Sequence, residues 1–298
     1  MWKPAAAPKL LAALAVLLAS VTLAGSPGAG ADTVDVQPVG SAPIPPGPAP
    51  TWVVADLDSG QILAGSGENV RHAPASTIKV LLAQVVLDEL PLDATVVADA
   101  ADADVECNCA GVRPGATYTT RQLLDGLLLV SGNDAANTLA HMLGGIGPAV
   151  AKMNAKAAAL GAHDTLAGSP SGLNGPGIDG FTTPHDLAII FRAALANPAF
   201  AQITATPRAP FPGPDGPREL VNQNELLFGY PGMLGGKTGF TDVAKKTYVG
   251  AAQRGDRRLV VAMMYGLVKE GGPTYWDQAS SLLDWGFALD RNASVGML

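Results

Sequence analysis

The pattern of hydrophobic and polar positions predicts strands towards both ends of the chain and helices between them. Residues 52–57 and 61–64 are short β-forming runs on either side of the turn Asp58-Ser59-Gly60, which predicts an antiparallel hairpin. A second hairpin is predicted where runs at 248–252 and 259–265 flank a turn at 254–257, and residues 235–241 lead into it.

Between the two hairpins, Leu- and Ala-rich segments predict helices. They cover residues 78–90, 120–130, 134–143, 150–160 and 184–196, and an amphipathic helix over 276–289 closes the chain. Strands at both ends of a chain with helices between them favour a mixed α/β fold, in which one sheet is interrupted by helical material.

The first fifty residues have the composition of an export signal and a spacer. Lys3 and Lys9 precede an uncharged run over 10–24, and Ala29-Gly30-Ala31 forms a small-x-small cleavage site. We expect a signal peptide over 1–31 that is cleaved near Ala31, with an uncleaved anchor as the alternative. The proline-rich residues 32–50 predict an extended, solvated linker, and residues 51–298 predict one large domain.

The charge of the chain argues against two classes of partner. Its formal net charge is −7, and removal of Lys3 and Lys9 with the signal would change this to −9. An acidic protein binds nucleic acid and anionic membranes poorly, so we expect no nucleic-acid partner, and the sequence indicates no protein partner. We expect an exported, extracytoplasmic protein.

A serine and a lysine begin the first predicted helix. Ser76 and Lys79 lie three residues apart and therefore face the same way, so the lysine amine can reach the serine hydroxyl. A serine needs such a base to become a nucleophile, and burial at the start of an apolar helix would keep the lysine largely unprotonated. Pro74 suits the first turn of a helix, which places Ser76 near the positive end of the helix dipole.

Two further motifs follow in a fixed order. Ser131-Gly132-Asn133 occupies a turn between two predicted helices, and Lys237-Thr238-Gly239 precedes the second hairpin. In isolation the first could be a helix-capping turn and the second a strand end. Together with Ser76-x-x-Lys79 they form the set that marks serine enzymes acting on penicillin and on D-Ala-D-Ala peptides.

Over residues 51–290 the sequence resembles the low-molecular-mass penicillin-binding proteins that are D-alanyl-D-alanine carboxypeptidases, serine peptidases of family S11. Further similar stretches are Pro74-Ala75-Ser76, residues 131–137, Ser171-Gly172-Leu173 and residues 237–242. The resemblance implies a β-lactamase/transpeptidase-like fold: an antiparallel sheet flanked by helices, with an inserted all-helical subdomain. It also implies trimming of peptidoglycan stem peptides that end in D-Ala-D-Ala, and inhibition by β-lactams.

The resemblance gives each motif residue an expected role. Ser76 would attack the penultimate D-alanine carbonyl, Lys79 would take its proton and Ser131 would relay a proton to the leaving amine. Asn133 would bind a substrate carbonyl and steady Lys79. Lys237 and Thr238 would supply a cation and a hydroxyl that bind the terminal carboxylate of the substrate. Gly239 would let an extended peptide lie along the strand edge. The backbone amides of Phe240 and Ser76 would form the oxyanion hole.

Two other functions remain open on the sequence. A β-lactamase of the same fold is disfavoured because the second motif is Ser-Gly-Asn and no glutamate follows Ser131 until Glu219. A catalytically silent module that binds peptidoglycan or β-lactams is disfavoured because every motif residue is present.

No cofactor or metal is expected, since His72, His141, His163 and His185 have no ligand spacing. Whether Cys107 and Cys109 form a disulfide stays open, because a bridge across one residue closes a very small ring.

Overall fold

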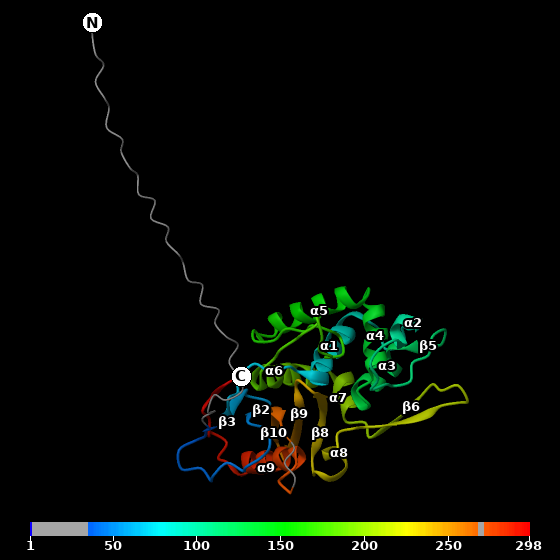
Figure 1. Cartoon of the computed structure of the whole chain (residues 1–298). Coiled ribbons are helices and arrows are strands. Elements are labelled where there is room, and N and C mark those ends of the chain that lie inside the picture. Colours follow the sequence, from blue (N-terminus) through cyan, green and yellow to red (C-terminus); the bar gives the residue numbers. More distant parts are fainter. Residues whose placement is uncertain (2–34, 268–270) are drawn as a thin grey trace. The chain divides into compact units, whose positions relative to one another are not determined.

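The computed structural model describes Met1 and residues 35–267 and 271–298. Residues 35–267 and 271–298 form a domain around one antiparallel sheet (Figure 1). Its central strands follow the order β3-β2-β10-β9-β8. The bounds are β2 Thr51–Asp56, β3 Gln61–Ser66, β8 Met233–Thr241, β9 Lys245–Arg254 and β10 Arg257–Gly266. The short strands β1 (Asp35–Val36) and β11 (Gly296–Met297) both pair with β3. β8 is therefore an edge strand, and both predicted hairpins are confirmed as β2–β3 and β9–β10.

Period-two alternation along the strands divides the core into two layers. Trp52 and Val54 of β2 pack on one face of the sheet with Leu282 and Leu283 of the C-terminal helix α9 (Tyr275–Ala288). Val53 and Ala55 face the opposite way, towards the helical part of the domain. Figure 1 shows the sheet between α9 and the helices that include α6 (Pro184–Leu195). The confirmed fold class is thus α/β, with an antiparallel sheet flanked by helices.

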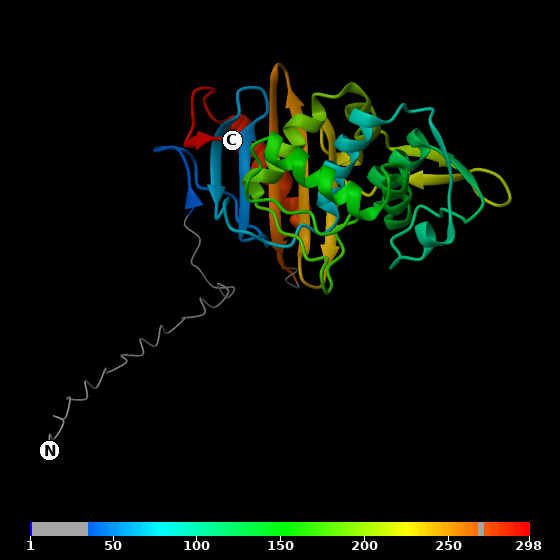
Figure 2. The ribbon, with the colours of Figure 1, turned by 90° about the horizontal axis from the view of Figure 1, so that it is seen from above.

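The helical material is inserted between β3 and β8, and Figure 2 shows it reaching beyond the edge of the sheet. A single 3₁₀ turn, η1 (Ala75–Ile78), leads into α1 (Lys79–Glu89), whose residues 79–86 are all buried. The other helices are α2 Ala100–Ala103, α3 Thr120–Leu129, α4 Asn133–Met142, α5 Ile146–Ala159, α7 Pro198–Thr204 and α8 Leu226–Gly229.

The expected all-helical character of the insertion is wrong in one respect. It contains two small antiparallel sheets, formed by β4 (Thr95–Val97) with β5 (Thr117–Thr119) and by β6 (Arg208–Phe211) with β7 (Arg218–Val221). These strands have three or four residues, which is too short for an alternating pattern to stand out in the sequence.

Residues 35–50 lie against the domain, whereas the sequence predicts a solvated linker over 32–50. The Trp285 indole Nε1 donates to Ala42 O at 2.9 Å, and the Gln278 side-chain amide bonds both the N–H and the carbonyl of Ala49 at 2.8 and 3.0 Å. These contacts use the backbone of the segment, so a count of its apolar side chains does not reveal them. The predicted signal peptide, residues 1–31, lies almost wholly outside the described residues.

Within residues 35–267 and 271–298 no single helix is long and apolar enough to cross a membrane; only α6 and α7 taken together pass that test, across a bend of 108°.

Candidate active site

Ser76 and Lys79 lie on consecutive turns at the start of the buried helix. Ser76 is in η1 and Lys79 begins α1, and Lys79 Nζ lies 2.9 Å from Ser76 Oγ. Ala75, just before the serine, has a left-handed φ of 47°, a conformation that is uncommon for a residue other than glycine and that occurs often at functional sites. The turn therefore presents the serine hydroxyl to the lysine amine.

Lys79 is completely buried and surrounded by acceptors. Its Nζ lies 2.7 Å from Ser131 O, 2.6 Å from Asn133 Oδ1 and 3.3 Å from Ser131 Oγ. Burial lowers the pKa of Lys79 well below its ordinary value, the nearby charge of Lys237 lowers it further, and the Asp134 carboxylate opposes this. The side chain is thus biased towards the neutral amine.

The hydrogen-bond geometry indicates where the lone pair of that amine points. Ser131 O and Asn133 Oδ1 can only accept hydrogen bonds, so they take the two N–H groups of a neutral amine. In the neutral amine the lone pair is then left for a hydroxyl, and Ser76 Oγ at 2.9 Å is nearer than Ser131 Oγ at 3.3 Å. This arrangement suits removal of the serine proton.

Ser131 connects the two lysines. It sits between α3 and α4 with a left-handed φ of 60°, and its Oγ lies 3.3 Å from Lys79 Nζ and 2.8 Å from Lys237 Nζ. Lys237, on β8, also donates to Thr238 O at 2.7 Å. Burial lowers the pKa of Lys237 to about 7. Sequence reasoning expected Lys237 at the substrate surface, but it lies beneath that surface, while Thr238 reaches the cleft.

A cleft of about 540 Å³ opens above these groups. Of the residues expected from the sequence, Ser76, Ser131, Asn133, Thr238, Gly239 and Phe240 line it. A Cβ built on Gly239 would lie 2.9 Å from Ser76 N and 2.3 Å from Thr247 Oγ1, so only glycine lets β8 approach the serine turn this closely. The edge of β8 is open beside the nucleophile, which permits an added peptide strand.

Sequence reasoning did not place several other residues in the cleft. Ser171 O lies 3.5 Å from Ser76 Oγ, and a Cβ on Gly172 would lie 1.9 Å from Ala75 O, so this short motif packs under the serine turn. Carboxylates, one cation and two aromatic rings also line the cleft: Glu106, Glu225, Asp242, Lys246, Tyr275 and Trp276. The sequence signal that could have identified Tyr275 and Trp276 is that two adjacent aromatic residues begin the C-terminal helix α9.

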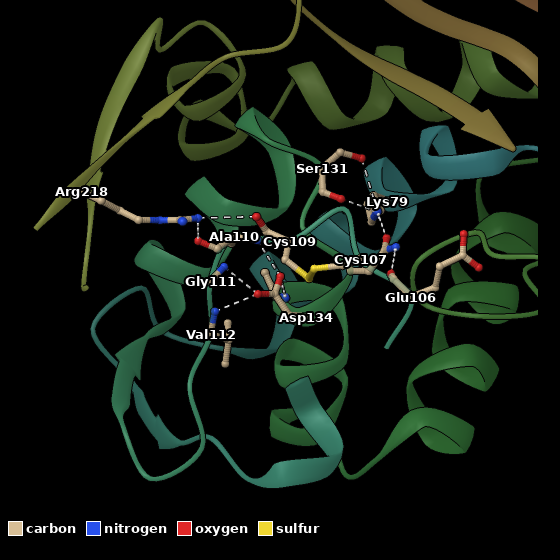
Figure 3. Close-up of a disulfide and its surroundings, with 12 residues drawn as sticks. Lys79, Glu106, Cys107, Cys109, Ala110, Gly111, Val112, Ser131, Asp134 and Arg218 are labelled. Atoms are coloured by element: carbon tan, nitrogen blue, oxygen red, sulfur yellow. Dashed lines mark hydrogen bonds between the residues drawn. A yellow bond between two sulfur atoms is a disulfide. The ribbon is translucent and has the colours of Figure 1, made fainter. Parts of the chain in front are cut away.

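The cysteine pair, left open by the sequence, forms a disulfide (Figure 3), and Cys107 lines the cleft. Cys107 belongs to a loop that reaches Asn133: Asn133 Nδ2 donates to Glu106 O at 2.7 Å, and Asn133 N donates to Asn108 O at 2.7 Å. The loop therefore contacts a residue that binds Lys79.

The histidines lie away from the reacting atoms. His72, beside the nucleophile in sequence, stacks on Tyr265 and is not part of the cleft lining. His141 lies with Asp99 and Asp102, which could hold a metal ion by distance alone. Their atoms already bond one another, since Asp102 Oδ2 accepts from Asp99 N at 2.9 Å and lies 3.1 Å from His141 Nδ1.

Comparisons with known proteins match the chain to a family of peptidases. The family model described as D-alanyl-D-alanine carboxypeptidase (Peptidase S11) matches residues 41–266. The chain is 72% identical to the D-alanyl-D-alanine carboxypeptidase DacB2 of Mycobacterium tuberculosis over 264 residues, which cover 89% of this chain and 91% of that protein.

Solved structures agree with the family match. The crystal structure of a D-alanyl-D-alanine carboxypeptidase from Mycobacterium tuberculosis H37Rv has a TM-score of 0.87 at 71% identity and covers 88% of this chain and 100% of the other. The DD-transpeptidase of Streptomyces K15 has a TM-score of 0.77 at 30% identity and covers 83% and 100%. The expected β-lactamase/transpeptidase-like fold is thus confirmed.

Proposed function

The chain belongs to the D-alanyl-D-alanine carboxypeptidase family of serine peptidases, and we propose that it releases the terminal D-alanine of peptidoglycan stem peptides through an acyl-enzyme on Ser76. The observation that carries the proposal is the buried Lys79 Nζ, 2.9 Å from Ser76 Oγ and within 2.7 Å of two oxygens that can only accept, Ser131 O and Asn133 Oδ1. That geometry supports a lysine that acts as a base.

In the first step Ser76 Oγ attacks the carbonyl carbon of the penultimate D-alanine, and its proton passes to Lys79 Nζ. The carbonyl oxygen becomes an oxyanion, which the backbone N–H groups of Ser76 and Phe240 stabilise. The proximity of Gly239 to Ser76 N supports this pair of donors. Collapse of the tetrahedral intermediate breaks the peptide bond.

The leaving nitrogen needs a proton as the bond breaks. Ser131 Oγ, which lies within hydrogen-bond reach of both lysines, delivers it from Lys79. Free D-alanine then departs and water hydrolyses the ester on Ser76.

Recognition of the substrate's free carboxylate involves Thr238 and Lys237. Thr238 lines the cleft, and the buried Lys237 Nζ donates to the Thr238 carbonyl at 2.7 Å. An anion at Thr238 gains attraction from a charge beneath the surface without displacing the bond from Lys237 to Ser131.

The proposed place of action is outside the cytoplasmic membrane. The predicted signal over 1–31 supports it, and β-lactams, which resemble the substrate's terminus, are the proposed inhibitors. N-terminal sequencing of the mature protein should find Asp32 or a neighbour; an intact Met1 in protein taken from the cytoplasm would contradict export.

The test is the release of free D-alanine from a peptide that ends in D-Ala-D-Ala. We expect Ser76→Ala and Lys79→Ala each to lower kcat by several orders of magnitude, because the two side chains act as one unit. Lys152→Ala is the matched control: this lysine is half-buried, lies outside the cleft and pairs with Glu89, so kcat should stay unchanged. Near-normal turnover by Lys79→Ala, with loss in Ser76→Ala, would show that Lys79 is not the base.

A further inference from the structure

The disulfide-containing loop 106–112 holds both ends of Asn133. Two of its carbonyls, from Glu106 and Asn108, lie on either side of Cys107 and accept from Asn133 Nδ2 and Asn133 N, each at 2.7 Å. On its other side Asn133 Oδ1 accepts from Lys79 Nζ at 2.6 Å. The Asn133 side chain thus joins the loop directly to the proposed base.

The Glu106 carbonyl fixes which way the Asn133 amide is turned. A carbonyl oxygen can only accept, so it requires the NH₂ group of the amide on its side and leaves Oδ1 for Lys79. In the flipped orientation the NH₂ group would point at Lys79 Nζ and compete with Ser76 for the lone pair. The orientation of this amide therefore decides whether Lys79 can accept the serine proton.

Asp134 holds the loop in place through its carboxylate (Figure 3). Its carboxylate, 1% exposed, accepts three loop N–H groups at 2.7 Å each, from Ala110, Gly111 and Val112. It also accepts from Ala135 N at 2.8 Å. Because the carboxylate is buried, its loss would leave these three loop amides without a partner.

Two further features hold the loop close to α4. A Cβ on Gly132 would lie 2.9 Å from Ala110 N, so the glycine permits the close approach. On the outer side Arg218 of β7 donates to Ala110 O. The Cys107–Cys109 disulfide constrains the part of the loop that carries the Glu106 and Asn108 carbonyls, which accept from Asn133.

We propose that Asp134 is a positioning residue for the reaction: by anchoring loop 106–112 it keeps the Glu106 carbonyl on the amide of Asn133, and so keeps the lone pair of Lys79 directed at Ser76. The proposal rests on the proposed function of the site. Asp134 itself does not line the cleft, so it acts on the reaction through the loop and Asn133.

The test is a double-mutant cycle on D-alanine release, with the variants Asp134→Asn, Asn133→Ala and their combination. We expect Asp134→Asn alone to lower kcat by about 10- to 100-fold, the range for a small misplacement of a catalytic group. KM should change little, because the Thr238 wall of the cleft is untouched. In the Asn133→Ala background the same substitution should have almost no effect on kcat, since the amide through which it acts is gone.

Asp186→Asn is the matched control. Asp186 is also a buried carboxylate; it accepts from Asp164 N and from Thr165 Oγ1, both at 2.8 Å, and lies outside the cleft. Its replacement should change kcat by the same small factor in both backgrounds. An equal loss of kcat from Asp134→Asn in the two backgrounds would overturn the proposal.

The electrostatic effect of Asp134 on Lys79 can be separated by the pH profile. The carboxylate raises the pKa of Lys79, so its removal alone would move the acid limb of kcat/KM to lower pH and leave the plateau unchanged. Misplacement of Asn133 lowers the plateau. A shifted limb with an intact plateau would contradict the positioning role.

A second variant keeps the test valid if Asp134→Asn does not fold. The double substitution Cys107→Ser with Cys109→Ser loosens the same loop without burying an unpaired group, and its loss of kcat should likewise vanish in the Asn133→Ala background. Additive losses there would overturn the proposal. A wild-type protein that neither releases D-alanine nor binds benzylpenicillin would instead refute the proposed function itself.

Discussion

At the residue scale, the two buried lysines that contact Ser131 Oγ must be in opposite protonation states. Lys79 must be neutral to accept the proton of Ser76, whereas Lys237 must be charged to attract a carboxylate. Burial lowers the pKa of both, and the charge of Lys237 lowers that of Lys79 further. The charged Lys237 therefore helps to keep its neighbour neutral.

The first prediction is a bell-shaped pH profile of kcat/KM for a free-acid substrate. The acid limb reflects protonation of Lys79, whose pKa lies well below its ordinary value, and the alkaline limb reflects loss of the proton from Lys237, with a pKa of about 7 in the free protein. In kcat the alkaline limb should lie at higher pH, because a bound carboxylate favours the charged lysine. Steady-state kinetics across the pH range test this, and a profile without an alkaline fall would contradict it.

A second prediction concerns the substrate's terminal carboxylate. Lys237→Ala should weaken kcat/KM for the free acid more than for the matching terminal amide, by about 2–5 kcal/mol, the usual cost of truncating one partner of a buried charge pair. Lys246→Ala is the control, because Lys246 itself lines the cleft. If Lys246→Ala shows the acid-selective loss and Lys237→Ala does not, Lys246 and not Lys237 recognises the carboxylate, and the prediction is wrong.

The sequence predicted the proposed site residues because each motif pairs side chains whose chemistry is recognisable. It could not predict that Lys237 bonds Ser131 from beneath the cleft, since depth depends on how β8 meets η1. Nor could it predict the task of the Glu106 carbonyl, because every residue carries a backbone carbonyl and only the fold decides where it points.

At the element scale, long periodic segments were predicted well and short ones were missed. The helix expected over 184–196 is α6, Pro184–Leu195, where Thr183 caps the first turn by accepting from Asp186 N. The segment Pro198–Thr204, which forms α7, has too few residues for a helical period to emerge, and its burial against other elements stabilises it.

A third prediction tests the close contact of β8 with η1. Gly239→Ala would place a methyl group 2.9 Å from Ser76 N, so the strand must move away and the oxyanion donors separate. We expect kcat to fall by about 10²–10³-fold, the cost of losing one such donor.

The matched control for this glycine is Gly147→Ala. Gly147 lies in α5 with nothing within 4 Å of an added Cβ, so the substitution should leave kcat unchanged and raise stability slightly, by about 0.4–1 kcal/mol. D-alanine release, benzylpenicillin acylation and thermal unfolding measure both variants. Normal acylation of Gly239→Ala would show that the contact is not needed.

At the scale of the whole molecule, the segment 35–50 joins the domain rather than spacing it from a membrane. A chain that starts at Thr51 would lose the pairing of β1 with β3 and the bonds to Gln278 and Trp285. The fourth prediction is a loss of about 3–5 kcal/mol, from the three bonds to Gln278 and Trp285 and those of the β1–β3 pairing at about 1 kcal/mol each, with kcat unchanged. Thermal unfolding and D-alanine release of chains that start at Asp32 and at Thr51 measure it; equal melting temperatures would refute it.

The fate of a β-lactam on Ser76 depends on the whole cleft. The sequence offers no glutamate soon after Ser131 to activate water, and although Glu106, Glu225 and Asp242 line the cleft, none of these described carboxylates hydrogen-bonds Ser76 or Lys79. A base typically contributes 10²–10⁴-fold, so deacylation of the drug should take on the order of minutes to hours.

The most direct measurement is therefore mass spectrometry of the protein after mixing with excess benzylpenicillin. We expect one added drug mass that persists, located on the peptide that contains Ser76, and no adduct on Ser76→Ala. Lys79→Ala should acquire the adduct far more slowly than the wild type. Rapid turnover of the drug without a lasting adduct, or an adduct on any other residue, would contradict an acyl-enzyme carboxypeptidase built on Ser76 and Lys79.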